Sequence, residues 1–312
     1  MRTEFANEDA PTMIRYALTH HSRYDYSSPA HHARHLLHLL PRSHGRQQVV
    51  MALLELTPAP DQRIEEQDYF GNALTSIACS AAHDFFETKL DAQILIEPWP
   101  IPLAEAERAQ AQPLTLADLR TAALNNPPLI EFLQATALTR ADAALTALAE
   151  ATLPNTATPV SAILALTQRI HADFTYEQGV TTITTTAASA LARRAGVCQD
   201  YAHVMIATLR AGGIPARYVS GYLRSAPDQT ATDDHRGAEQ THAWVSAWLG
   251  PDLGWRDVDP TNNLVVDTDH IILAYGRDYA DVSPVRGVLL GGGAHTPYVS
   301  VRLTRIDHIP PG

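Results

Sequence analysis

One stretch, residues 196–223, limits what this chain can fold into more than any other. It begins with Gly196, sets Cys198 at the start of an expected helix, and closes that helix with a Gly-Gly pair followed by Pro215. Apolar residues recur at three- and four-residue intervals through the helical part, which is typical of one buried face. The residues after the proline alternate as those of a strand do. The fold must therefore accommodate a packed helix that carries a cysteine at its N-terminal end and leads into a strand.

A thiol at the N-terminal end of a helix is well placed to act as a nucleophile. The unpaired backbone N–H groups and the positive end of the helix dipole favour the thiolate, which is the reactive species. The same N–H groups can hold the oxyanion that forms when a thiolate attacks a carbonyl, and Gln199 could add a donor. The alternative for Cys198 is a small buried apolar side chain, which is the commoner fate of a lone cysteine. We favour that interpretation for Cys79.

A nucleophilic cysteine needs a base, and the base needs a partner that orients it. Residues 241–249 are typical of a strand with His242 among aromatic residues on one face and a wholly apolar opposite face. After a turn, residues 255–262 form the expected return strand, which carries Asp257 and Asp259. A helix with cysteine followed by a hairpin with histidine and aspartate is the layout of a thiol triad.

His203 is the competing base. It lies on the same expected helix as Cys198, five residues later, which turns it about 140° away from the sulfur. We therefore assign the base to His242. Asp200, in the first turn of that helix, is interpreted as a carboxylate that the helix dipole favours.

The orienting carboxylate is either Asp257 or Asp259, which share a face because they are two residues apart on a strand. A turn centred on Asp252 pairs His242 with Asn262 and leaves Asp257 farther from the histidine by about 6–7 Å along the strand. The carboxylate must come within hydrogen-bond distance of the imidazole, so this register favours Asp259. Asp257 would then be solvated or paired with an arginine.

These segments resemble the bacterial transglutaminase-like superfamily. The similarity rests on Gly-Val-Cys-Gln-Asp-Tyr-Ala-His, Gly-Ile-Pro-Ala-Arg-Tyr-Val-Ser-Gly-Tyr, His-Ala-Trp-Val and Trp-Arg-Asp-Val-Asp-Pro-Thr-Asn, and it extends to the start from Met13 and to residues 276–287. The resemblance implies an α+β, papain-like core with the cysteine helix packed on an antiparallel sheet, and an N-terminal β-sandwich-like domain. It also implies a triad of Cys198, His242 and Asp259.

Members of this family are often described as cysteine proteases, and the family mixes hydrolysis, acyl transfer and inactive proteins. We expect a transglutaminase-like cysteine peptidase or amidase that hydrolyses a peptide or glutamine-type amide through a thioester. Two alternatives stay open: transfer of the acyl group to an amine, which needs a site that excludes water, and a non-catalytic peptide-binding module on the same fold.

No cofactor or metal is expected. The four histidines that could suggest a metal site fall on an expected strand, where no three of them converge, and they lack nearby cysteine or carboxylate ligands. They are His31, His32, His35 and His38.

The net charge of −11 argues against a nucleic-acid or anionic-membrane surface, which would need clustered Lys and Arg. The sequence has no apolar run of transmembrane length, and residues 1–12 lack the basic start and apolar core of a signal peptide. Two cysteines far apart in the sequence do not make a disulfide framework. We therefore expect a cytoplasmic protein whose partner is a peptide or protein substrate.

Composition divides the 312 residues into four parts. Residues 1–12 are an expected extension. Residues 13–98 contain strands separated by turn signals, one of them at residues 27–29, which suggests a β-sandwich-like domain. Residues 99–158 are rich in Ala and Leu at helical spacing between proline-marked boundaries. Residues 159–312 are expected to form the catalytic domain with further C-terminal strands.

Overall fold

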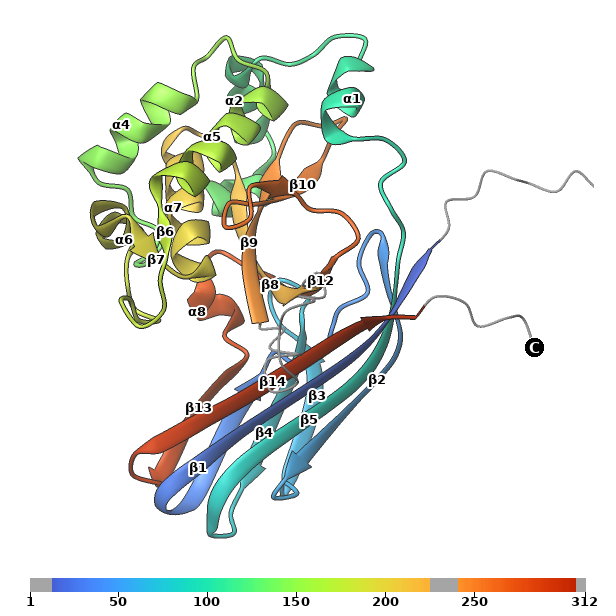
Figure 1. Cartoon of the computed structure of the whole chain (residues 1–312), viewed down its shortest axis with the longest axis vertical. Helices are drawn as coiled ribbons and strands as arrows, with labels where there is room; N and C mark the ends of the chain where they lie inside the picture. The colour runs from blue at the N-terminus through green and yellow to red at the C-terminus, as the bar shows by residue number, and fades with distance from the viewer. Residues whose placement is uncertain (1–12, 225–240, 307–312) are drawn as a thin grey trace, which may run out of the picture.

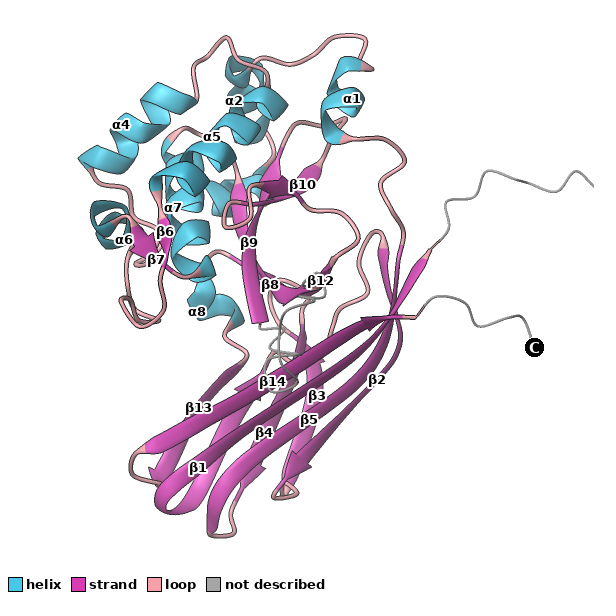
Figure 2. Cartoon of the chain, viewed as in Figure 1, coloured by secondary structure: helices cyan, strands magenta, loops and turns pink. Residues whose placement is uncertain are grey.

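The computed structural model describes residues 13–224 and 241–306; the expected extension at residues 1–12 lies outside them. The α+β architecture is confirmed (Figures 1 and 2). A sheet of long N-terminal strands forms one end of the molecule and a group of helices forms the other, with a smaller antiparallel sheet between them. No helix in the described ranges is long and apolar enough to cross a membrane.

The N-terminal sheet is organised around one long strand, β1 (Ile14–Leu37). The first half of β1 pairs with β5 and β14, and its second half pairs with β4 and β13. The order β2-β5-β1-β4-β3, with β13 and β14 added to β1, makes a seven-stranded sheet. Its other strands are β2 (Gln47–Thr57), β3 (Gln62–Gln67), β4 (Ala73–Cys79), β5 (His83–Ile96), β13 (Val285–Gly291) and β14 (His295–Arg305).

The expected turn at residues 27–29 is present, as a bend within β1. Phe86 pairs with Tyr24 before the bend and stacks on His35 after it, with ring centroids 4.4 Å apart, so the two halves of β1 face each other. One expectation about this sheet was wrong: the C-terminal strands at residues 285–305 do not join the catalytic sheet. They pair with β1, as the red and blue ribbons in Figure 1 show.

The catalytic sheet has five antiparallel strands in the order β11-β10-β9-β8-β12. The strands are β8 (Ala216–Leu223), β9 (Thr241–Trp248), β10 (Trp255–Asp259), β11 (Leu264–Val265) and β12 (His270–Gly276). A short parallel pair, β6 (Thr175–Tyr176) and β7 (Ala195–Gly196), lies before the cysteine helix. The helices are α1 (Leu103–Arg108), α2 (Leu116–Leu124), α3 (Pro127–Ile130), a 3-10 turn (Glu131–Leu133), α4 (Ala143–Thr152), α5 (Pro159–Asp173), α6 (Ala187–Arg193), α7 (Cys198–Ala211) and α8 (Tyr279–Val282).

Helix α7 is the centre of the catalytic half, and its side chains from Gln199 to Arg210 are all buried. Because such a helix has no exposed polar face, contacts at its ends set its rotation about the helix axis. At the C-terminal end the Arg210 guanidinium donates to the carbonyls of Phe132, Ala216 and Arg277. Gly213, with φ of 74°, then turns the chain into β8. The position of Cys198 is therefore set by packing along the whole helix.

The N-terminal sheet docks on β12, the edge strand of the catalytic sheet. The side-chain amide of Gln47 both donates to and accepts from the backbone of Ile272 at 2.8 Å. The amide of Asn72 does the same for Tyr275, at 2.7 and 2.8 Å. These amides satisfy backbone groups that an edge strand otherwise leaves open.

Most of the strand face that carries His242 and the aromatic residues is buried. Trp244 is fully buried, although it shares the His242 face of β9. It packs with Val266 and Tyr275, and Tyr275 in turn contacts His44 from the N-terminal half. Only the beginning of β9, at Thr241 and His242, is partly exposed.

Candidate active site

A cleft of about 360 Å³ lies where the N-terminal end of α7 meets the beginning of β9. Cys198 and His242 both line it, and both are partly exposed. The other cysteine, Cys79, is buried in the N-terminal sheet, where burial raises the pKa of its thiol. The remaining residues of the cleft wall are Tyr176, Gln178, Val197, Gln199, Tyr218, Ser220, Thr241, Ala243, Tyr279 and Pro284.

His242 connects the sulfur to a carboxylate. Its Nε2 lies 2.7 Å from Oδ2 of Asp259, and its ring shares the cleft wall with the Cys198 sulfur, close enough for that sulfur to raise the pKa of the imidazole. Burial alone would lower the pKa of His242, but the hydrogen bond and charge of Asp259, together with the Cys198 sulfur, outweigh it and raise the pKa to about 10. The imidazole is therefore built to carry a proton next to the sulfur.

Asp259 ends β10 and is fully buried. A buried carboxylate is costly unless several donors surround it. Besides the imidazole, Oδ2 accepts the side-chain amide of Asn262 at 2.7 Å, and Oδ1 accepts the backbone N–H groups of Thr261 and Asn262. Although burial would raise the pKa of Asp259, its histidine partners hold it well below the usual range. The tight turn after Asp259 thus keeps the carboxylate charged and aimed at His242.

The hairpin register differs from our prediction by one residue. Val258 pairs with Val245 and Asp257 with Ser246, because the loop between the strands closes from Leu249 to Gly254 and is not centred on one residue. Had our register held, Asp259 would have faced the apolar side with Val245. The observed register puts both aspartates on the His242 side.

The two aspartates have different partners on that side. Asp259 bonds His242, whereas Asp257 accepts the indole N–H of Trp244 at 3.0 Å. Asp257 is partly exposed and lines the cavity between the sheets. None of the described arginines forms an ion pair with it, so of our two expectations the arginine pairing was wrong.

The N-terminal end of α7 has its own hydrogen-bond arrangement. The buried carboxylate of Asp200 accepts the backbone N–H of Val197 at 2.8 Å and the hydroxyl of Thr181 at 2.7 Å. Burial raises the pKa of Asp200, against the effect of those two bonds. A side chain at Gly196 would come within 2.3 Å of the Asp200 carboxylate, which explains the glycine before the cysteine.

The helix start also offers backbone donors. The N–H groups of Asp200 and Tyr201 bond the carbonyl of Val197, whereas those of Cys198 and Gln199 have no carbonyl one turn earlier. The Gln199 side-chain amide donates to the carbonyl of Ile183 at 3.3 Å. In the structure this amide therefore holds the neighbouring loop.

His203 lies away from the cleft, in the fully buried part of α7. Its Nε2 accepts the backbone N–H of Tyr279 at 3.2 Å, and burial lowers its pKa to about 3. A neutral histidine in this position supports packing between α7 and α8.

Sequence reasoning missed His270, the first residue of β12. Its Nε2 lies 3.2 Å from Oδ2 of Asp259, and its ring meets that of Trp244 edge to face. Within the described ranges, His242, Asp259 and His270 are the one group of three whose metal-type ligand atoms lie within 4.8 Å of one another. Since these atoms already hydrogen-bond to each other, the arrangement is that of a polar network.

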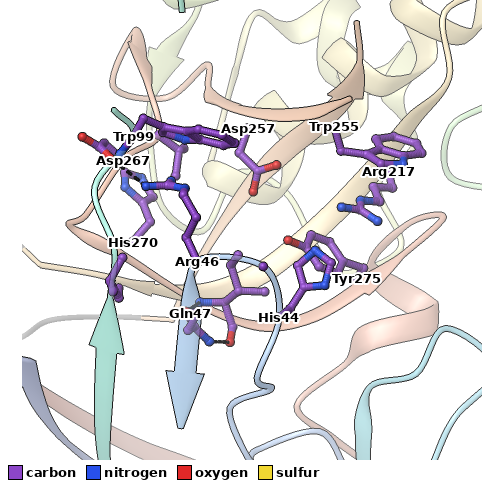
Figure 3. A pocket seen from close by; sticks show the side chains of 14 residues that line it. His44, Arg46, Gln47, Trp99, Arg217, Trp255, Asp257, Asp267, His270 and Tyr275 are labelled. Carbon is purple, nitrogen blue, oxygen red and sulfur yellow. Dashed lines mark hydrogen bonds and ion pairs between the residues drawn. The ribbon is translucent and has the colours of Figure 1, made fainter. Parts of the chain in front are cut away.

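A second cavity, of about 120 Å³, lies between the two sheets and does not include Cys198 (Figure 3). Arg217 points into it between the rings of Trp255 and Tyr275, 4.3 and 3.6 Å from their centroids. His270 forms part of its wall. None of the described residues that line this cavity is a cysteine, serine or threonine, so we assign it to the junction of the sheets and not to the chemistry of Cys198.

Three of the four histidines considered for a metal lie on β1, and His38 follows its last residue. His35 stacks on Phe86 with ring centroids 4.4 Å apart, and His38 bonds the carboxylate of Asp68. These two contacts are with different neighbours.

Comparison with known proteins agrees with this geometry. The family described as Transglutaminase-like superfamily matches residues 146–260, and the Bacterial transglutaminase-like N-terminal region matches residues 16–95. An uncharacterized protein of Mycobacterium tuberculosis is 36% identical over 288 residues, covering 88% of this chain and 87% of the relative. One of Mycobacterium leprae is 32% identical over 294 residues, covering 94% and 100%.

Among solved structures, one described as a putative cysteine protease from Cytophaga hutchinsonii superposes with a TM-score of 0.73 at 22% identity, over 96% of this chain and 93% of that one. That likeness extends over both sheets and shows that the whole arrangement is a known fold. Family matches in both halves, a full-length relative above 30% identity and the shared fold together establish that this chain belongs to the bacterial transglutaminase-like superfamily.

Proposed function

We propose that the protein is a thiol hydrolase that cleaves a peptide or glutamine-type amide through a triad of Cys198, His242 and Asp259. One observation carries the proposal: the sulfur at the start of a helix and the imidazole of His242 line one cleft, and that imidazole is bonded to a fully buried carboxylate. This is the arrangement of nucleophile, base and orienting group that covalent catalysis requires.

In this mechanism the Cys198 thiolate attacks the carbonyl carbon and a C–S bond forms. The charge moves to the carbonyl oxygen, within reach of the N–H groups at the helix start. His242 then gives its proton to the leaving nitrogen, the C–N bond breaks, and a thioester remains. Water loses a proton to His242 as it attacks the thioester, which releases the acid and restores the thiolate.

The wall of the cleft supports an uncharged substrate side chain. None of the described residues that line it is Asp, Glu, Lys or Arg. A neutral side chain such as glutamine would lose little solvation there, whereas a basic one would find no carboxylate among those residues and an acidic one would compete with Asp259 for His242.

Acyl transfer to an amine is the second candidate. A protein-glutamine gamma-glutamyltransferase of Pseudomonas aeruginosa is 43% identical over 68 residues, which are 22% of this chain and 10% of that protein. The match is local, so we favour hydrolysis, because water is always present and transfer needs a site that excludes it.

The deciding experiment incubates the protein with a peptide library, with and without a primary amine, and reads the products by mass spectrometry. Shortened peptides identify a protease, conversion of an amide to an acid identifies a deamidase, and addition of the amine identifies a transferase. Cys198→Ala is the matched control, because it removes one sulfur beside a cleft. Absence of any product with the unaltered protein would favour a peptide-binding module and contradict the proposal.

A further inference from the structure

His270 is a buried histidine that the mechanism above does not use. It is 3% exposed, and its Nε2 lies 3.2 Å from the Asp259 oxygen that also accepts His242. The ring of Trp244 packs against it at 4.9 Å and an interplanar angle of 77°. The imidazole can hardly rotate in this setting, so the direction of Nε2 is fixed.

The contact matters because one carboxylate oxygen serves two imidazoles. Oδ2 of Asp259 accepts His242, which lines the cleft, at 2.7 Å and His270, which lines the cavity between the sheets, at 3.2 Å. A buried carboxylate turns toward whichever donors surround it. Without His270, this oxygen would keep only His242 and the Asn262 amide, and the charge on Asp259 would lose a donor.

The position of His270 depends in turn on the docked N-terminal sheet. Asp269, the residue before it, accepts the hydroxyl of Tyr16 from β1 at 2.8 Å and is paired with Arg224. Gln47 holds the backbone of Ile272, two residues after it. Figure 3 shows His270 in the wall of the cavity between the two sheets.

We propose that His270 is a positioning residue that donates its Nε2–H to Asp259 and thereby holds the triad carboxylate toward His242. The proposal deepens the proposed function and rests on it. The N-terminal sheet then contributes to the active site indirectly, because its contacts hold the strand that carries His270.

The test compares His270→Gln with His270→Leu. Glutamine can extend an N–H to about the same reach as the imidazole Nε2, whereas leucine has a similar volume and no donor. The readout is the rate of Cys198 alkylation by iodoacetamide from pH 4 to 9, which needs no substrate. His270→Leu is expected to shift the pH of half-maximal alkylation upward by about one unit, a tenfold change in an ionisation constant. His270→Gln is expected to restore most of the original profile.

A folded His270→Leu variant with the original profile would overturn the proposal. Should that variant not fold, ¹⁵N NMR of the unaltered protein decides: a proton on Nε2 of His270 supports the proposal, and a proton on Nδ1 alone refutes it. If the proposed function itself were wrong, Cys198 of the unaltered protein would show no enhanced alkylation at all. That result is distinct from an unchanged profile in His270→Leu.

Discussion

Asp259→Asn is the substitution that most directly tests the triad. The carboxylate is fully buried and accepts the imidazole N–H of His242 at 2.7 Å. A hydrogen bond with a charged partner contributes about 1.5–3 kcal/mol, and each 1.36 kcal/mol is a factor of ten in rate. We therefore expect kcat/KM to fall by about 10- to 150-fold.

Asp257→Asn is the matched control on the same strand. An asparagine oxygen can still accept the indole N–H of Trp244, which Asp257 accepts now at 3.0 Å, so turnover is expected to change by less than about twofold. The assay is kcat/KM of both purified variants on the peptide found by library screening, with circular dichroism to show that each is folded. If Asp257→Asn were the impaired variant, the orienting carboxylate would be misassigned.

The pH dependence of Asp259→Asn provides a second readout. The charge and hydrogen bond of Asp259 help to raise the pKa of His242, against the effect of burial, to about 10. Without that charge the imidazolium loses its proton at a lower pH. The alkaline limb of kcat/KM should therefore move toward neutral pH, and an unchanged limb would contradict the coupling.

Three further predictions concern reactivity, acid stability and specificity. In a short exposure to iodoacetamide at pH 6, Cys198 should be alkylated far faster than Cys79, whose pKa is raised by burial; peptide mapping that shows equal labelling would refute the nucleophile assignment. The pKa of His35 is lowered to about 4 by burial, so its contribution to stability is complete above the unfolded pKa of about 6.5 and is lost as the pH falls toward 4. Between pH 7.5 and 5, urea unfolding of the unaltered protein should therefore lose about 2 kcal/mol more than that of His35→Phe, and parallel losses would contradict this. Because the cleft wall carries no Asp, Glu, Lys or Arg among its described residues, peptides with glutamine at the reacting position should be turned over faster than those with glutamate or lysine, and a preference for a charged residue would contradict this.

Local sequence patterns predicted the helix and strand that surround the nucleophile. The observed α7 begins at Cys198, and β8 covers the expected residues 216–223. Glycine, proline and apolar periodicity act over a few residues, so these features can be read without knowledge of the rest of the chain. The same local information brought His242 and Asp259 to one hairpin, whose observed geometry joins them.

The features that the sequence did not reveal depend on distant contacts. The hairpin register depends on how the loop from Leu249 to Gly254 closes, and a difference of one residue exchanges the two faces of a strand. Trp244 is buried by Val266 and Tyr275, which lie 22 and 31 residues further along the chain. His270 reaches Asp259 only because β12 pairs with β8, across about fifty residues of sequence. No local pattern carries that information.

The pairing of β1 with the C-terminal strands has a consequence for synthesis in the cell. Residues 16–26 are made first, yet their partners on one side are residues 295–305. At about 5–20 residues per second, roughly 15–55 s pass between the two. During that time β5 and β4 can cover one edge of β1, while the other edge presents unpaired N–H and C=O groups that can pair with a neighbouring chain. The nascent protein thus exposes an aggregation-prone edge until its last strands leave the ribosome, and ribosome-associated chaperones would meet it in that state.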